Sequence, residues 1–122
     1  MGPARVTFTD DAWDDWCDLD RSAQLTVGKA IAKLETDPHL RGAPLGNRSD
    51  GSLTSFRKLP AGRRKEYRVV YRVDPDGTVV VIWVIGLRAN DEAYKMARAR
   101  LRLDPNPAVR ALMDSLDELW EL

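Results

Sequence analysis

The segment that decides the fold reads EYRVVYRVDPDGTVVVIWVIGL and spans residues 66–87. Apolar and polar side chains alternate in its first part, residues 66–73, which is typical of a β-strand with one buried face. The DPDG that follows predicts a hairpin turn, because Pro fixes one backbone φ angle and Gly supplies a positive one. Residues 79–87 are apolar on both faces, as expected of a central strand. The sequence therefore predicts an antiparallel hairpin at the centre of the fold.

Two further strands are predicted upstream of this hairpin. Residues 55–59 form a short strand and residues 60–65 a basic turn, so that three strands follow one another as a meander. Residues 5–9 form the first strand of the chain, in which Val6 and Phe8 share a face. The sheet is expected to be antiparallel throughout.

Two helices are predicted between the first strand and the meander. The first buries a stripe at positions i, i+3 and i+4, formed by Trp13, Trp16 and Cys17. The second carries apolar positions from Val27 to Leu34 and ends at Asp37-Pro38, because the residue before a proline disfavours helix. We expect the two helices to form an antiparallel pair on one face of the sheet. Residues 38–52 are rich in Gly, Pro and Asn and predict a loop.

Two more helices are predicted downstream of the hairpin, at the edge of the sheet. Asn90 caps the first, which carries arginines in its last turns, where the helix dipole favours cations. Its apolar stripe consists of Ala93, Met96, Ala97 and Leu101. The closing helix, capped by Asn106, is strongly amphipathic, with apolar positions from Val109 to Trp120.

Length and composition indicate a single domain over residues 1–122, without metal or cofactor. The 122 residues include one Cys and one His, too few for an internal disulfide or a four-ligand zinc site, so a reduced, cytoplasmic location is expected. The longest apolar run, residues 79–87, has nine residues, about half of what a membrane span needs. No membrane partner is expected.

Charge is segregated along the chain, although 19 basic residues balance 19 acidic ones. Residues 57–72 hold seven Lys and Arg against one Glu, whereas residues 1–20 and 104–122 are acidic. A basic block of this density is typical of a polyanion contact. The acidic ends argue against indiscriminate binding of nucleic acid by the whole surface.

Three motifs in this order resemble the RelE/ParE superfamily, the toxins of bacterial type II toxin–antitoxin systems. They are FRKL (56–59), YRVVYRV (67–73) and VIGLR (84–88), the last followed by Asp91 and Tyr94. The likeness covers about residues 4–103 and leaves a helical extension at about 105–122. It implies an α+β fold of order β-α-α-β-β-β-α, with an antiparallel sheet packed on two N-terminal helices and an extra C-terminal amphipathic helix.

The resemblance also implies an activity and its partners. RelE-like members cleave mRNA in the ribosomal decoding site, whereas the ParE-like branch poisons DNA gyrase without nuclease chemistry. Carried over by position, the catalytic residues are Lys58, Arg68, Arg88 and Tyr94. The basic residues expected to bind RNA are Arg57, Arg63, Arg64, Lys65 and Arg72. The implied partners are a cognate antitoxin, the ribosome and mRNA, with a homodimer as a further alternative.

The sequence departs from the family pattern in three places. Phe56 stands where some relatives have Lys, and Leu87 stands where many have His or Lys. The turn at residues 61–66 is longer than usual and richer in Arg.

The same residues allow metal-independent RNA cleavage on chemical grounds. The RNA's own 2′-OH attacks the adjacent phosphate and yields a 2′,3′-cyclic phosphate, so the protein must remove one proton, stabilise phosphate charge and protonate the 5′ oxygen. Lys58 or Tyr94 as the base needs its pKa lowered from about 10 toward 7. A cluster of arginines, Arg57, Arg68 and Arg88, shifts either pKa in that direction. We expect these guanidinium groups to converge on one pocket.

Other interpretations remain open. Arg68 and Arg72 project from the sheet face opposite the tyrosines, and such arginines ordinarily form a solvated face. Three alternative functions for the chain are a gyrase poison, a non-toxic domain that binds a partner, and a plain nucleic-acid-binding module.

The closing helix also has alternative interpretations. It packs on the domain's own apolar groove, where an antitoxin segment would bind, or it completes the core or joins two copies. In the first case its acidic residues lie near the basic hairpin: Asp114, Asp117, Glu118 and Glu121.

Overall fold

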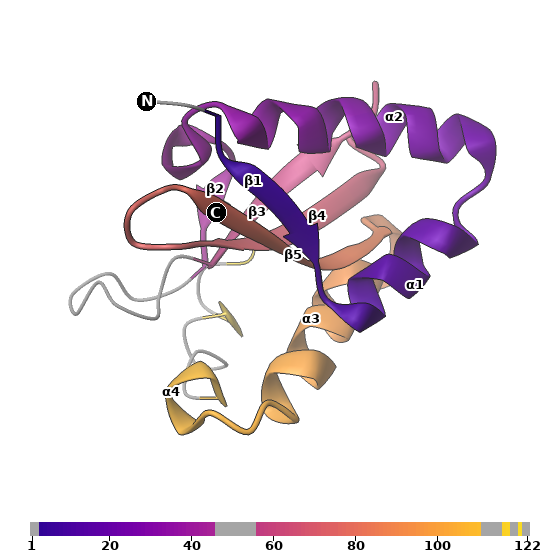
Figure 1. Cartoon of the computed structure of the whole chain (residues 1–122). Helices are drawn as coiled ribbons and strands as arrows, with labels where there is room; N and C mark the ends of the chain where they lie inside the picture. The colour runs from indigo at the N-terminus through magenta and orange to yellow at the C-terminus, as the bar shows by residue number, and fades with distance from the viewer. Residues whose placement is uncertain (1–2, 46–55, 111–115, 118–119, 121–122) are drawn as a thin grey trace.

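The computed structural model describes residues 3–45, 56–110, 116, 117 and 120, and it confirms the α+β class (Figure 1). The strands are β1 (Arg5–Phe8), β2 (Ala43–Pro44), β3 (Phe56–Ala61), β4 (Tyr67–Val73) and β5 (Val79–Leu87). The α-helices are α1 (Asp10–Asp18), α2 (Arg21–Ala32), α3 (Glu92–Arg102) and α4 (Pro107–Arg110). Short 3₁₀ turns lie at Lys33–Glu35, Pro38–Leu40 and Ala89–Asp91. Among the described helices, none is long and apolar enough to span a bilayer.

The strands form one mixed sheet in the order β1-β5-β4-β3-β2. The predicted meander of β3, β4 and β5 is antiparallel, but β1 pairs parallel to β5, from Arg5 beside Val79 to Phe8 beside Ile82. The expectation of a wholly antiparallel sheet is therefore wrong at this edge. Parallel neighbours need a long connection and covered faces, and the chain between β1 and β5 supplies both.

A two-residue edge strand lies in the segment predicted to be a loop. Ala43 and Pro44 of β2 pair with Lys58 and Arg57 of β3. Pro44 is acceptable there, because an edge strand has one side without ladder hydrogen bonds. The remainder of the predicted loop, from residue 46, lies outside the described residues.

Helices α1 and α2 cover one face of the sheet, where the first hydrophobic core includes Val27, Leu34, Val69 and the fully buried Tyr71 (Figure 1). The predicted stripe of α1 is only partly buried: Trp16 packs against this core, but Trp13 is 51% exposed and Cys17 is exposed. The helix approaches the sheet through the small Ala12 instead, so the bulky Trp13 lies at the rim, edge-on to Phe8.

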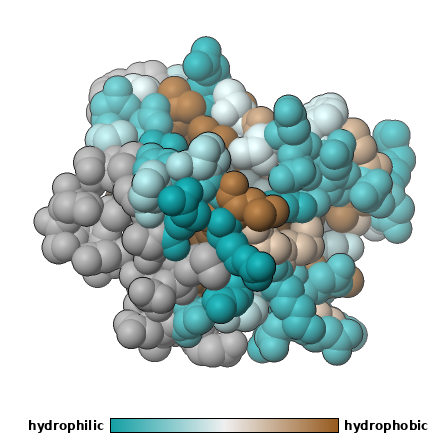
Figure 2. Space-filling view, turned by 90° about the horizontal axis from the view of Figure 1, so that it is seen from below, coloured by the Kyte–Doolittle hydropathy of each residue, from teal (hydrophilic) through white to brown (hydrophobic). Residues whose placement is uncertain are grey.

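The opposite face of the sheet is covered by α3, which corrects the expectation that this helix lies at the edge. Val70 and Val84 are buried there with the helix's apolar stripe. Gly86 permits the close packing, because a Cβ at this position would lie 2.9 Å from the Ala93 Cα. The face opposite the tyrosines is thus a second core and not an open solvated surface. Seen from the α3 side, hydrophilic side chains cover most of the described surface (Figure 2).

The closing helix is described in part. Its first turn is α4, and the backbone N–H of Trp120 donates to the Leu116 carbonyl at 3.0 Å, which is helical spacing. Val109, Leu116 and Trp120 are buried in the second core, so the described residues of the closing segment complete the domain's own core. Asp114, Glu118 and Glu121 lie outside the described residues.

Candidate active site

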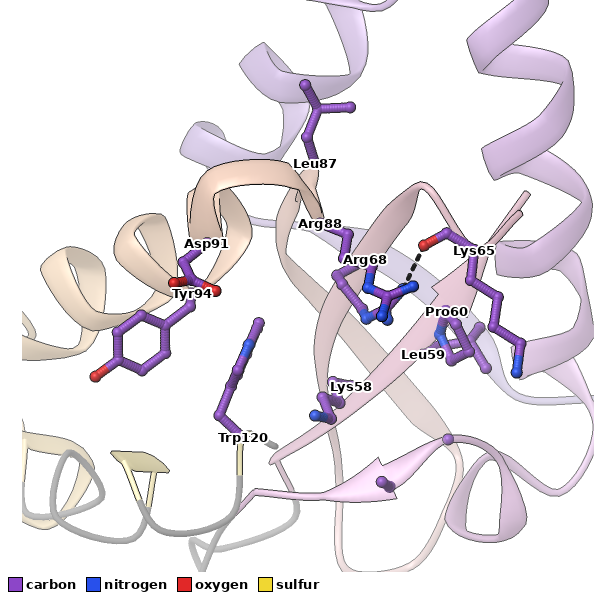
Figure 3. Close-up of a pocket in the computed structure, with 12 residues that line it drawn as sticks. Lys58, Leu59, Pro60, Lys65, Arg68, Leu87, Arg88, Asp91, Tyr94 and Trp120 are labelled. Carbon is purple, nitrogen blue, oxygen red and sulfur yellow. Dashed lines mark hydrogen bonds between the residues drawn. The ribbon is translucent and has the colours of Figure 1, made fainter. Parts of the chain in front are cut away.

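A cavity of about 680 Å³ opens between β2, β3, the β3–β4 turn and the start of α3 (Figure 3). Of the described residues that line it, one is acidic, Asp91, and four are basic: Lys58, Lys65, Arg68 and Arg88. Tyr94 and Trp120 complete the wall on the helix side. The cavity therefore presents an excess of positive charge together with two aromatic rings.

Neighbouring strands bring the basic side chains together. Arg68 of β4 lies opposite Gly86 of β5, and Arg88 follows two residues later in the chain. The Arg68 guanidinium donates to the Lys65 carbonyl at 2.6 Å and to the Tyr67 carbonyl at 3.1 Å, which fixes it against the β3–β4 turn (Figure 3). The backbone N–H of Arg88 donates to the Glu66 carbonyl at 2.8 Å. Register and turn together place both guanidinium groups at one wall.

Lys58 enters the cavity from β3 and is only 9% exposed. Its ammonium lies 5.0 Å from the centre of the Trp120 ring, which is a cation–π contact. Lys58 pairs with Val70 across the ladder, and so its side chain lies on the α3 side of the sheet.

Three non-glycine residues in or next to the cavity wall adopt left-handed backbone conformations. Lys65 in the β3–β4 turn has φ of 56°, and Asn90 and Asp91 have φ of 58° and 54°. Asn and Asp tolerate this region better than other side chains do, which accounts for their use here. The two consecutive left-handed residues turn the chain sharply after Arg88 and direct α3, with Tyr94, along the cavity.

Tyr94 is held by acidic and aromatic partners. Its hydroxyl donates a short hydrogen bond to Asp117, and its ring lies edge-on to Trp120 with centroids 5.5 Å apart. The hydrogen bond to the Asp117 carboxylate raises the pKa of Tyr94, and the opposing effect of Arg98 is smaller. The expected lowering of this pKa by arginines is therefore wrong, because the nearest charged partner is a carboxylate.

Arg57 does not reach the cavity, so the expected convergence of three arginines holds for Arg68 and Arg88 only. Successive residues of a strand face opposite sides, and Arg57 lies on the Tyr71 side of β3. Its guanidinium donates to the Arg41 carbonyl at 2.6 Å and to the Gly42 carbonyl at 3.3 Å. Through these hydrogen bonds Arg57 holds the segment that leads into β2 in place.

The other predicted RNA-binding residues are divided between locations. Lys65 lines the cavity, whereas Arg63 lines a second hollow beside α2. Arg64 is exposed in the β3–β4 turn. Arg72 lies at the far end of β4, opposite Phe56, and does not line the cavity.

Sequence reasoning missed an ion pair that supports the site. Arg100 of α3 binds both oxygens of Asp15 of α1, at 2.7 and 2.9 Å, and also donates to the Trp83 carbonyl at 2.8 Å. Asp15 accepts in addition from the Ile85 backbone N–H at 3.0 Å. The hydrogen bonds that Arg100 donates to Asp15 raise the pKa of Arg100. This network joins α1, β5 and the helix that carries Tyr94.

Sequence reasoning also missed Trp120 as part of the cavity wall. Its helical spacing signalled burial, but nothing in the pattern indicated which surface the ring would meet. Within the described part of the chain, no three His, Cys, Asp or Glu side chains are grouped to hold a metal ion.

Comparison with known proteins identifies the fold and the family. Residues 6–92 match the family described as the ParE toxin of the type II toxin–antitoxin system parDE. A putative RelE-like toxin protein from Escherichia coli is 26% identical over 98 residues, which are 80% of this chain and 97% of the relative.

Solved structures of toxins share the fold of this chain. The RelBE2 toxin–antitoxin complex from Mycobacterium tuberculosis contains a chain that is 31% identical, with 74% of this chain and 97% of that chain covered and a TM-score of 0.56. A mutant of the E. coli toxin RelE in the free state has the same fold, at 22% identity, 83% and 99% coverage and a TM-score of 0.60. The resemblance inferred from the three motifs is confirmed, and the chain belongs to the RelE/ParE family of toxins of type II toxin–antitoxin systems.

Proposed function

We propose that this toxin cleaves mRNA on the ribosome, with the RNA's own 2′-OH as the nucleophile. The observation that carries the proposal is the shared cavity of Lys58, Arg68, Arg88 and Tyr94. Permanently charged guanidinium groups are suited to the oxygens of a phosphodiester, and a hydroxyl and an amine beside them can transfer protons.

In this proposal, the arginines bind phosphate, and the tyrosine and the lysine transfer protons. Arg68 and Arg88 bind the scissile phosphate and stabilise the charge that develops on it, Arg68 from the fixed position that the Lys65 carbonyl gives it. Tyr94, whose raised pKa keeps its proton, is a donor to the 5′ oxygen and not a base. Lys58 is then the remaining candidate to accept the proton of the 2′-OH.

Exposed cations extend the contact beyond the cavity. Arg63 and Arg64 lie in the same turn as Lys65, and their charges would meet phosphates flanking the cut site. Arg57 contributes indirectly, because it holds the segment whose Gly42 and Ala43 line the cavity. Ribosomes and mRNA, the proposed partners, place this activity in the cytoplasm.

A cognate antitoxin is the remaining partner in the proposal. Similar solved chains come from toxin–antitoxin complexes, RelBE2 of M. tuberculosis and an archaeal RelE–RelB complex from Pyrococcus horikoshii. An antitoxin that neutralises this chain is expected to cover the same positively charged cavity.

The direct experiment is induction in bacteria followed by mapping of mRNA 5′ ends. New 5′ ends within translated regions are expected from the native chain and not from a Lys58→Ala/Arg88→Ala double variant. A Lys29→Ala/Arg21→Ala variant removes two exposed cations from α2 and serves as the matched control, since both lie outside the cavity. Intact transcripts under the native chain would contradict the proposal.

Gyrase poisoning is the second candidate, because the matching family is that of ParE toxins. That activity needs no general acid or base, so Tyr94→Phe and Lys58→Ala would leave growth arrest unchanged. Arrested replication with intact mRNA would identify it.

A further inference from the structure

Three described residues near the end of the chain, Leu116, Asp117 and Trp120, are here named the C-terminal strap, and one of them, Trp120, lines the cavity. They lie beyond residue 92, where the match to the toxin family ends. Leu116 is 1% and Trp120 8% exposed, so these two residues are packed into the second core, whereas Asp117 is exposed.

The strap contacts two of the groups assigned to the chemistry. The Trp120 ring lies 5.0 Å from the Lys58 ammonium and 5.5 Å from the centre of the Tyr94 ring. Asp117 accepts the hydrogen bond of the Tyr94 hydroxyl. In Figure 3 the Trp120 ring stands between Tyr94 and Lys58.

These contacts conflict with the binding of RNA. Tyr94 cannot give its proton to a 5′ oxygen while it donates to Asp117, and a phosphodiester beside Lys58 needs space that the Trp120 ring takes. The Asp117 carboxylate also brings negative charge to a site that is otherwise suited to phosphate. The strap therefore holds Lys58 and Tyr94, two of the groups that the proposed chemistry needs, in contacts with the protein itself.

The exposed ion pair of the C-terminal strap is easily broken. The ion pair between Asp117 and Arg98, at 3.4 Å, joins side chains that are 48% and 44% exposed, and exposed pairs contribute little to stability. The apolar contacts of Leu116 and Trp120 in the second core are the buried part of the strap's attachment.

We propose that the C-terminal strap is an internal competitor that engages Lys58 and Tyr94 in the resting toxin and must release them before RNA is bound and cleaved. The inference rests on the proposed function in that it concerns the same site. The engagement of Lys58 by the strap can be measured without any cleavage assay.

The test compares full-length Trp120→Ala with Trp13→Ala, the loss of a more exposed tryptophan that does not line the cavity. The first readout is the rate at which an amine-reactive reagent modifies Lys58, followed by mass spectrometry, with the exposed Lys29 as the internal standard. Loss of the strap's ring contacts should accelerate modification of Lys58 by about fivefold or more, and Trp13→Ala should leave the rate unchanged. Equal rates in native chain and folded Trp120→Ala would overturn the proposal.

The second readout is the affinity for a short single-stranded RNA with 2′-O-methyl groups, which cannot be cleaved. Asp117→Asn keeps the apolar packing of the strap and should tighten binding several-fold, whereas Asp14→Asn, an exposed aspartate on α1, should raise the affinity less. If Trp120→Ala fails to fold, Asp117→Asn still tests the proposal. Equal gains in RNA affinity in Asp117→Asn and Asp14→Asn would mean that the effect arises from overall charge, and they would overturn the proposal. Failure of every variant to cleave mRNA would count against the proposed function and leave these two readouts intact.

Discussion

The Tyr94 hydroxyl and the Asp117 carboxylate, 23 residues apart in sequence, are joined by a hydrogen bond in which tyrosine is the donor. The bond ties a helix of the family fold to a segment beyond the matched region. It requires the proton to stay on the tyrosine for as long as the bond is intact.

Replacing Asp117 with Asn should lower the pKa of Tyr94 toward the ordinary tyrosine value. The carboxylate raises this pKa because its negative charge and its hydrogen bond both disfavour the tyrosinate form. Ultraviolet absorbance of tyrosinate during an alkaline titration measures the change, and Tyr94→Phe identifies which transition belongs to this residue. An unchanged transition in the Asn variant would show that another group sets the pKa.

Tyr71 should make the fold sensitive to alkali. Burial raises its pKa to about 12, whereas an unfolded tyrosine titrates near 10. Above pH 10 the unfolded chain loses this proton first, so stability is fully present below about pH 10 and falls until about pH 12, by up to about 3 kcal/mol.

Urea unfolding at a series of alkaline pH values measures that slope. Tyr71→Phe should flatten it, although this variant starts from a lower stability because the hydroxyl no longer donates to the Arg41 carbonyl. A slope equal to that of the native chain would assign the alkaline loss to other groups.

The sequence predicted the elements whose signals are local. Alternation in β4, the turn before β5 and the stripe of α3 all depend on residues within a few positions of one another. Alternation also separates Arg57 from Lys58, but it cannot say which face of β3 will meet a cavity. The partners of Arg100 and Trp120 are set by packing between distant elements, and Asp15 lies 85 residues from Arg100. No local pattern carries such information, which is why the partners of these two side chains could not be predicted from the sequence.

Replacement of Arg88 by Ala should reduce mRNA cleavage, whereas replacement of Arg57 by Ala should reduce stability. Arg88 is exposed in the cavity wall, so Arg88→Ala should leave stability nearly unchanged and reduce mRNA cleavage by on the order of a hundredfold to a thousandfold. Arg57→Ala removes two hydrogen bonds to backbone carbonyls and should cost about 1–3 kcal/mol of stability. Thermal melting and quantified mRNA 5′ ends separate the two effects. Loss of cleavage in a fully stable Arg57→Ala protein would move that residue into the site.

Breaking the ion pair between Asp15 and Arg100 should destabilise the fold and loosen α3. The two side chains are 10% and 20% exposed, and removal of one partner leaves a mostly buried charge without compensation. Asp15→Asn should therefore cost about 2–4 kcal/mol, below the range for a fully buried pair because some solvent reaches both groups. The exposed Arg98→Ala should cost less than about 1 kcal/mol by comparison. Urea denaturation measures both, and hydrogen exchange in residues 92–102 should accelerate in Asp15→Asn, because Arg100 is the side chain that ties this helix to α1. Equal stability of the two variants would mean that the apolar contacts of Ala93, Ala97 and Leu101 alone hold the helix in place.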